Sequence, residues 1–376
     1  RTSLYSNVIL SSKLLLMYSH HNKLIPHSLS VFLHMPHRNI YSWNIIIGEF
    51  SRSSFSKSSL QLFVTMLRES HFRPDDFTLP LVLRACACST GDARIGGSLH
   101  GLCVKSGLEV NLFVASALVF MYVNFGKIFN ARKLFDRIPK RDSVLWTTML
   151  AGYAQQGEPL LGFQVFKDMV EFGVELDWVV MVSLLLLCAQ MGWLKHGRTI
   201  HGWCIRKYLN LGLNLGNAII DMYIKCGTLN HAHNLFDKMP ERDIISWSSL
   251  ISGYGLSGNV NLALSLFNTM LENRVKPNGV TFLGVLSACA HGGLVEKARG
   301  YFKMMEKYGV VAELKHCAAM VDCLARAGMV EEAERFVREM EIEPDEAVLC
   351  AILNGCFVHG NVEVGERIIE NWIKVN

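Results

Sequence analysis

The 376-residue sequence contains no block of like charge. Its 37 basic and 33 acidic side chains leave a net charge of +4, so no basic tail indicates a nucleic-acid ligand. A weakly positive protein still binds RNA where its positive charge is concentrated on one face. The longest apolar run, residues 178–189, is too short to cross a bilayer and predicts a buried helix. Half of the residues are hydrophobic, which excludes disorder and supplies a large core.

Metal-binding signatures are also missing. None of the fourteen histidines is followed two residues later by glutamate, and no two of the eleven cysteines are spaced as C-x-x-C. A zinc-dependent nucleobase deaminase needs both signatures to hold its metal and to move a proton. No clustered acidic or histidine constellation of a nuclease is present either. The sequence therefore predicts that this chain is no enzyme and holds no metal and no cofactor.

The sequence repeats itself with a period of about 101 residues. Trp43, Trp146 and Trp247 are 103 and 101 residues apart. Several other series share this spacing: Tyr18, Tyr122 and Tyr223; Pro36, Pro139 and Pro240; Cys86, Cys188 and Cys289; and His100 and His201. Independent markers with one spacing indicate tandem duplication.

Each period contains three shorter units, and residues 244–278 show how one is built. Its first half has apolar residues at the i, i+3, i+4, i+7 spacing of an amphipathic helix, which are Trp247, Leu250, Ile251 and Tyr254. Gly255 and Gly258 are expected to end that helix. A second apolar stripe follows, made of Leu262, Ala263, Leu266, Phe267 and Met270. A lone helical hairpin cannot bury two such stripes, so the units must stack into a solenoid.

The alignment gives ten units of three lengths. They are residues 8–39, 40–75, 76–111, 112–142, 143–177, 178–212, 213–243, 244–278, 279–313 and 314–345. Residues 1–7 are assigned to the end of a preceding unit, and residues 346–376 to the start of a different segment. Pro26 lies in the expected second helix of the first unit, where an interior proline costs about 3 kcal/mol, so we expect that unit to be distorted.

The unit sequences resemble a known repeat family. NAIIDMYIKCGTLNHAHNLFDKMPERD and DIISWSSLISGYG are similar to pentatricopeptide repeats of the plant type that alternates 31-, 35- and 35/36-residue motifs. The segment from Leu314 onward resembles the last short motif and the start of the family's E-type C-terminal extension. The resemblance covers essentially the whole chain. It implies an all-α fold, a right-handed α-solenoid superhelix of stacked helical hairpins.

The resemblance also implies that the chain binds single-stranded RNA with one base per repeat. In the family, the fifth residue and the last residue of a repeat recognise the base. By position these pairs are Ser12 and Asn39, Asn44 and Asp75, Ser116 and Asp142, Thr147 and Asp177, Asn217 and Asp243, and Ser248 and Asn278. The family's preferences assign them A, U, G, G, U and A. The predicted word, 5′ to 3′ along the chain, is A-U-n-G-G-n-U-A-n-n.

Four repeats receive no letter, because their fifth residue cannot hydrogen-bond a base. Their pairs are Pro80 and Asn111, Val182 and Gly212, Leu283 and Glu313, and Ala318 and Asp345. A structural interpretation competes with readout at every pair, since Ser, Thr, Asn and Asp commonly cap helices. Six pairs in phase favour readout.

The other recurring residues are interpreted as structural, and not as binding or catalytic residues. The three tryptophans could form a base-stacking platform, but their place on the apolar stripe favours the core. Cys86, Cys188 and Cys289 are interpreted as small core residues. His100 and His201 are interpreted as residues that pack or hydrogen-bond between helices.

Plant proteins with this alternation typically select cytidines for C-to-U editing in organelle transcripts. The resemblance therefore implies an editing-site recognition factor, whose deaminase comes from a further domain or from a partner in trans. The expected location is the mitochondrion, with the chloroplast as the alternative, and a transit peptide would precede Arg1. The chain has no expected membrane contact. The alternatives are a factor for RNA processing or stability and a protein-binding scaffold of the tetratricopeptide kind.

Overall fold

The computed structural model describes residues 8–19, 25–52, 55–69, 72–89, 93–207 and 211–373. Within these ranges every regular element is a helix, so the all-α prediction is confirmed. None of the described helices is both long enough and apolar enough to span a membrane. Residues 1–7, assigned above to a preceding repeat, lie outside the described part of the chain.

The helices fall into two compact units, residues 1–187 and 188–376. The first unit contains α2 (Val8–Ser19), α3 (Ile25–His34), α4 (Ile40–Arg52), α5 (Ser56–Glu69), α6 (Thr78–Cys88), α7 (Ala93–Lys105), α8 (Leu112–Asn124), α9 (Ile128–Arg137), α10 (Ser143–Gln155), α11 (Pro159–Glu171) and most of α12 (Trp178–Met191). The second contains α13 (Leu194–Lys207), α14 (Gly212–Lys225), α15 (Leu229–Lys238), α16 (Ile244–Leu256), α17 (Val260–Glu272), α18 (Gly279–Gly292), α19 (Val295–Lys307), α20 (Leu314–Arg326), α21 (Val330–Glu339), α22 (Glu346–His359), α23 (Val362–Ile368) and a π-helical turn, Ile369–Ile373.

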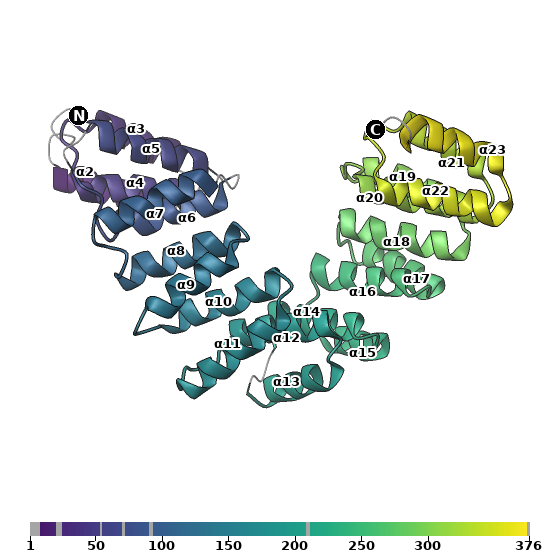
Figure 1. Cartoon of the computed structure of the whole chain (residues 1–376), viewed down its shortest axis with the longest axis horizontal. Helices are drawn as coiled ribbons and strands as arrows, with labels where there is room; N and C mark the ends of the chain where they lie inside the picture. Colours follow the sequence, from purple (N-terminus) through teal and green to yellow (C-terminus); the bar gives the residue numbers. More distant parts are fainter. Residues whose placement is uncertain are drawn as a thin grey trace. The chain divides into compact units, whose positions relative to one another are not determined.

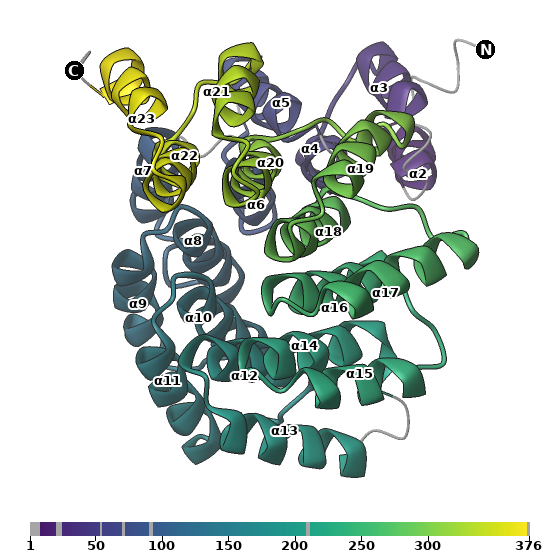
Figure 2. The same ribbon diagram turned by 90° about the vertical axis from the view of Figure 1, so that its right-hand side faces the viewer.

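Within each unit, the helices form hairpins that stack in chain order. In the first unit α4 packs on its hairpin partner α5, and the first helices α4, α6, α8 and α10 pack on one another in sequence (Figure 1). In the second unit α14, α16, α18, α20 and α22 form the corresponding series (Figure 2). The first helices thus form one layer of the stack and the second helices the other, as expected of a solenoid.

The recurring tryptophans lie in the core. Trp43, Trp146 and Trp247 are at most 3% exposed. Each meets a phenylalanine of the preceding helix edge-to-face, such as Phe236 with Trp247, whose ring centroids are 4.7 Å apart. Cys86, Cys188 and Cys289 are also buried. The interpretation of both series as core residues is confirmed, and base stacking by these tryptophans is excluded by their burial.

The recurring histidines join neighbouring repeats. His100 Nδ1 on α7 lies 2.8 Å from the Tyr122 hydroxyl on α8, and His201 on α13 contacts Tyr223 on α14 at 2.9 Å. Both histidines therefore form the interhelix hydrogen bonds that the sequence predicted.

Pro26 does not distort its helix in the way predicted. It is the second residue of α3, within the first helical turn. An N–H at that position has no partner inside a helix, so a proline there removes no hydrogen bond. The expected cost of an interior proline was wrong, because Pro26 lies in the first turn of α3 and not in its interior.

Two assignments in the repeat 244–278 also need correction. Gly255 does not end α16, since the helix continues through Leu256. The turn is instead made at Gly258, whose φ of +76° is accessible to glycine at little cost. Leu262, placed on the buried stripe, is 43% exposed, whereas the other members of that stripe are buried.

Candidate nucleic-acid interface

The predicted last residues all lie at helix N-termini. In each of the six lettered repeats, Oδ1 of the last residue accepts the backbone N–H of the residue three positions later. The distances are 2.8 Å at Asn39, 2.7 Å at Asp75, 2.8 Å at Asp142, 3.0 Å at Asp177, 2.9 Å at Asp243 and 2.9 Å at Asn278. These bonds satisfy backbone N–H groups at the starts of the helices and fix the side chains in place.

Capping alone does not identify a reader. Asn111 caps α8 and Asp345 caps α22 in the same way, although neither belongs to a lettered pair. The capping interpretation is therefore sufficient to explain why Asp or Asn stands before these helices. A base-reading residue would be distinguished from a simple cap by the contacts that its side chain makes besides the capping bond.

Two pairs do make a direct contact. Asn217 Nδ2 on α14 donates to Asp243 Oδ1 at 3.0 Å, and Asn44 Nδ2 on α4 donates to Asp75 Oδ1 at 3.2 Å. Both members of each pair belong to one repeat: the asparagine lies on its first helix, and the aspartate, its last residue, stands at the start of the next repeat's first helix. The structure thus brings together the fifth and last residues of both pairs assigned to uracil.

The other fifth residues behave differently, because their side chains are shorter. Thr147 and Ser248 donate their hydroxyls to carbonyls one turn back in their own helices, Ser143 O at 2.9 Å and Ile244 O at 2.6 Å. The Ser12 and Ser116 hydroxyls have no hydrogen-bond partner among the described residues. Buried hydroxyls usually have a partner, so these two retain an unused donor and acceptor.

Thr78 and Ser246 complete the two Asn–Asp contacts, and the sequence analysis missed them. The Ser246 hydroxyl lies 2.6 Å from Asn217 Oδ1 and 2.9 Å from Asp243 Oδ1. The Thr78 hydroxyl lies at the same place in its repeat, 2.7 Å from Asn44 Oδ1. A hydroxyl three residues after an Asp before a helix is the capping-box pattern, which would have drawn attention to both residues.

The contacts lower the pKa of the two aspartates. Burial opposes ionisation of Asp243, but hydrogen bonds from the Ser246 N–H, the Asn217 amide and the Ser246 hydroxyl outweigh it and hold its pKa below the ordinary value. Asp75 has a lowered pKa for the same reason, with Thr78 and Asn44 as its donors. Both side chains are therefore carboxylates at neutral pH and act only as acceptors.

A row of exposed apolar side chains lies three residues before the fifth position. Its members are Ile9, Tyr41, Phe77, Phe113, Val144, Ile245 and Val280, between 45% (Val280) and 71% (Phe77) exposed. The sequence analysis did not single them out, although apolar residues recurring in phase outside the buried stripe were the available signal. Scattered exposed apolar residues need no explanation, but a periodic row does.

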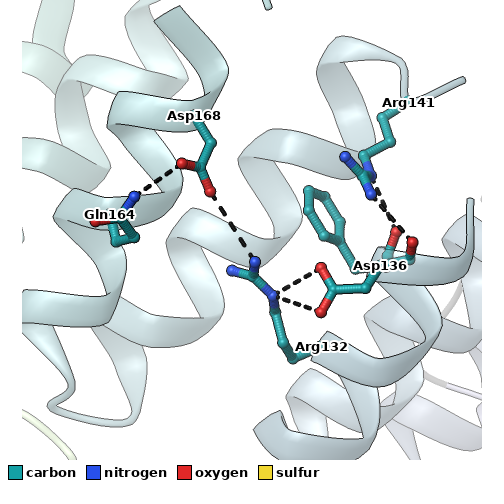
Figure 3. A network of polar contacts seen from close by, with 6 residues as sticks. Arg132, Asp136, Arg141, Gln164 and Asp168 are labelled. Carbon is teal, nitrogen blue, oxygen red and sulfur yellow. Dashed lines mark hydrogen bonds and ion pairs between the residues drawn. The ribbon is translucent and has the colours of Figure 1, made fainter. Parts of the chain in front are cut away.

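In several repeats an arginine stands directly before the last residue and donates hydrogen bonds to the end of the preceding helix. Arg141, directly before Asp142, donates from Nε to Phe135 O at 3.0 Å and from Nη2 to Asp136 O at 3.2 Å. Figure 3 shows this guanidinium at the end of α9, beside Arg132, which binds Asp136 and approaches Asp168 of α11. The network ties one repeat to the next and fixes the linker.

Comparisons with known proteins agree with the repeat pattern. A family profile described as "PPR repeat family" matches residues 242–291, and one described as "PPR repeat" matches residues 144–174, 217–244, 280–310 and 316–343. The pentatricopeptide repeat-containing protein At4g14170 of Arabidopsis thaliana is 60% identical over 375 residues, covering 100% of this chain and 78% of that protein. The chain belongs to the pentatricopeptide repeat family.

Other relatives in this family are more distant. The Arabidopsis thaliana pentatricopeptide repeat-containing proteins At4g25270, chloroplastic, and At3g13770, named as putative and mitochondrial, are 38% and 37% identical. They cover 96% and 91% of this chain, which spans 68% and 54% of their lengths. The crystal structure of the pentatricopeptide repeat protein PPR10 with an 18-nt psaJ RNA element has a TM-score of 0.75 at 16% identity, over 98% of this chain and 55% of that one. That likeness confirms the solenoid fold.

Among the residues placed by the structure, no three His, Cys, Asp or Glu side chains gather in a way that could hold a metal ion. The eleven cysteines are all free, and burial raises the pKa of Cys188 and Cys289 to about 12. Such thiols stay protonated and unreactive at neutral pH.

Proposed function

We propose that this chain binds single-stranded RNA in a sequence-dependent manner, with one base at each lettered pair. The observation that carries the proposal is the contact of Asn217 with Asp243, repeated with the same geometry by Asn44 and Asp75. A cap requires only the aspartate. An asparagine brought against it from the first helix of the same repeat adds a donor, and the two side chains together form a polar group that can face a base.

The Asn–Asp pair is complementary to uracil. The Asn217 amide and the Ser246 backbone N–H both donate to Asp243 Oδ1, and Oδ2 can accept the N3–H of a uracil. The second N–H of the Asn217 amide can donate to a uracil carbonyl oxygen. Guanine offers the same donor and acceptor on a larger ring. The shorter Ser116 and Thr147 leave more room beside their aspartates, in keeping with their assignment to G.

The row of exposed apolar side chains is further evidence for the proposal, because bases bound at these pairs would lie next to it. Phe77, Phe113 and Tyr41 present rings near the start of the first helices, one turn before the fifth position. Stacking of bases on exposed aromatic side chains is worth about 1–3 kcal/mol per base and tolerates any sequence. In this proposal the apolar row supplies affinity, and the polar pairs select the letters.

The direct experiment is binding of the chain to A-U-n-G-G-n-U-A-n-n and to a shuffled RNA of the same composition. We expect sub-micromolar binding to the first and clearly weaker binding to the second. Asn217→Thr should then shift the preference at the seventh letter from U toward G. The assignment of repeats to letters is wrong if this variant binds both RNAs as before, and equal indifference to every RNA would support a protein-binding scaffold.

We further propose that the protein recognises editing sites in an organelle transcript, and that the deaminase is a further domain or a partner protein. The alternation of short and long motifs that resembles plant editing factors supports this, and so does the occurrence of mitochondrial and chloroplastic proteins among the relatives. The test is loss of the gene followed by sequencing of both organelle transcriptomes. Loss of C-to-U conversion at a cytidine downstream of the word supports editing. Altered transcript ends or abundance without lost conversion would indicate a processing or stability factor.

Location can be tested separately with the full-length reading frame fused to a fluorescent protein. We expect a mitochondrial signal, and a chloroplast signal would correct that preference.

A further inference from the structure

The hydroxyl of Ser246 joins two repeats at a base-recognition pair. It belongs to α16, yet it lies 2.6 Å from Oδ1 of Asn217 on α14 and 2.9 Å from Oδ1 of Asp243. Thr78 repeats this arrangement on α6, 2.7 Å from Asn44 Oδ1 and 2.8 Å from Asp75 Oδ1. Ser246 and Thr78 are both fully buried, so neither is placed to contact RNA itself.

Electrostatics fixes the orientation of the asparagine amide in this cluster. A carboxylate only accepts hydrogen bonds, so the amide must turn its Nδ2 toward Asp243. Its Oδ1 then faces Ser246, whose single proton is donated to it across the shorter of the two contacts. The Asn217 amide is thereby held at both ends, and one N–H remains for a base. Loss of the hydroxyl would leave Oδ1 without its donor and the amide free to turn away.

The residue at the Ser246 position is Ser or Thr in four of the lettered pairs, including those with Ser12 and Ser248 as fifth residues, and it is apolar in the other two. Leu145 and Val180 occupy it after Asp142 and Asp177, whose own repeats have Ser116 and Thr147 as fifth residues. Those side chains have no amide to orient. A hydroxyl at this position accompanies an asparagine in both Asn–Asp pairs of the chain.

We propose that Ser246 and Thr78 are positioning residues for base recognition, each fixing the amide of the preceding repeat's asparagine so that the pair selects uracil over cytosine. The proposal rests on the RNA-binding function proposed above. Uracil accepts a hydrogen bond at O4, where cytosine presents an amino donor, so a fixed amide N–H favours uracil. An amide that can turn its Oδ1 outward accepts from that amino group, which weakens the distinction and leaves only the N3–H contact with the aspartate to favour uracil.

The test uses the whole chain and RNAs that carry U or C at the seventh letter of the predicted word. Ser246→Ala should lower the U-over-C affinity ratio there about three- to tenfold, the effect expected of one ordinary hydrogen bond. The same ratio at the second letter, assigned to Asn44 and Asp75, should not change. Ser246→Thr keeps a hydroxyl and should restore the wild-type ratio.

Thr281→Ala is the matched control. Thr281 completes an equivalent capping box at the start of α18 with Asn278 and is not part of the Asn217 cluster. The Thr281→Ala variant should lower the melting temperature about as much as Ser246→Ala does. It should leave the U-over-C affinity ratio at the seventh letter unchanged. Should Ser246→Ala fail to fold, Thr78→Ala provides the same test at the second letter.

Two outcomes would overturn the proposal and are distinguishable. If Ser246→Ala weakens binding to both RNAs equally, in step with its melting temperature, the hydroxyl is only a cap. If the wild-type chain itself shows no preference between U and C at either letter, the proposed RNA readout fails together with the positioning role.

Discussion

Arg242 donates a hydrogen bond from its guanidinium Nε to the carbonyl oxygen of Phe236 at 2.7 Å. A second bond runs from Nη2 to Asp237 O, also at 2.7 Å, and the guanidinium carbon stands 4.8 Å from the centre of the Phe236 ring. These carbonyls lie in the last turn of α15, where a helix has no internal donors for them and favours positive charge. Arg38 and Arg141 make the same contacts with Phe32 and Phe135.

The first prediction concerns this clamp. Arg242→Lys should lower the free energy of unfolding by about 1–2 kcal/mol, because an ammonium keeps the charge and loses the planar pair of donors. Chemical denaturation measures the change. Arg335→Lys, at an exposed arginine of α21, is the control and should stay within about 0.5 kcal/mol of wild type. Equal effects of the two substitutions would show that the charge alone matters.

The sequence predicted the features of the fold that depend on local pattern. The repeat period and the residue type placed Trp247 in the core, and the alignment of repeats placed Asp243 directly before an amphipathic helix. Gly255 was misassigned, because a glycine near a helix end looks the same whether it ends the helix or admits a neighbouring backbone. Only the packing of α16 on α18 distinguishes these roles.

The candidate site was predictable in part for a similar reason. The periodicity and the family resemblance identified Asn217 and Asp243, whose contact makes readout plausible. The contact of Ser246 with Asn217 joins helices of successive repeats across 29 residues. Its existence depends on the distance between α14 and α16, which tertiary packing sets and no local pattern records.

The second prediction concerns the stability of the fold at acid pH. The hydrogen bonds that lower the pKa of Asp243 stabilise the fold above the ordinary aspartate pKa, near 4, and that contribution is lost as pH falls through the lower, folded value. Asp243→Asn keeps a capping oxygen, so it should cost about 0.5–1 kcal/mol at pH 6 and less at pH 3. Melting temperatures at the two pH values measure this. If Asp243→Asn lowers the stability equally at pH 6 and pH 3, ionisation of Asp243 is excluded as the cause of the loss.

The third prediction concerns Glu49 on α4, which is 1% exposed. The equivalent residues of later repeats, six positions after the tryptophan, are Gly152 and Gly253. Burial raises the pKa of Glu49, opposed by the Ser28 hydroxyl and the charge of Arg52. For a carboxyl group with a raised pKa, the stabilising contribution is present below the unfolded pKa and is lost as pH rises through the folded value.

Glu49→Gln removes this titration. The variant should therefore gain stability over wild type as pH rises from 4 to 8, reaching on the order of 1–3 kcal/mol, the usual cost of an unsatisfied buried polar group. Thermal unfolding across that range measures it. Glu272→Gln, at an exposed glutamate of α17, should leave the pH dependence as it is. A Glu49→Gln difference that is independent of pH would refute the argument.

The fourth prediction concerns the approach of α16 to α18. A Cβ added at Gly255 would lie 2.2 Å from the carbonyl oxygen of Gly284, and one added at Gly284 would lie 2.9 Å from the Ser252 backbone. The two backbones are in direct contact, with no flexible side chain between them to yield. Gly255→Ala should therefore destabilise the protein by about 1–3 kcal/mol.

Gly300→Ala on α19 is the matched control, because nothing lies within 4 Å of its added Cβ. Alanine is a better helix former than glycine, so this variant should gain about 0.5–1 kcal/mol. Urea unfolding of both variants measures the difference, and equal effects would show that α16 and α18 stand farther apart. Since α16 carries Ser248 and Asn278 caps α18, a wider spacing in Gly255→Ala should also weaken binding of the predicted word without changing the preferred letters.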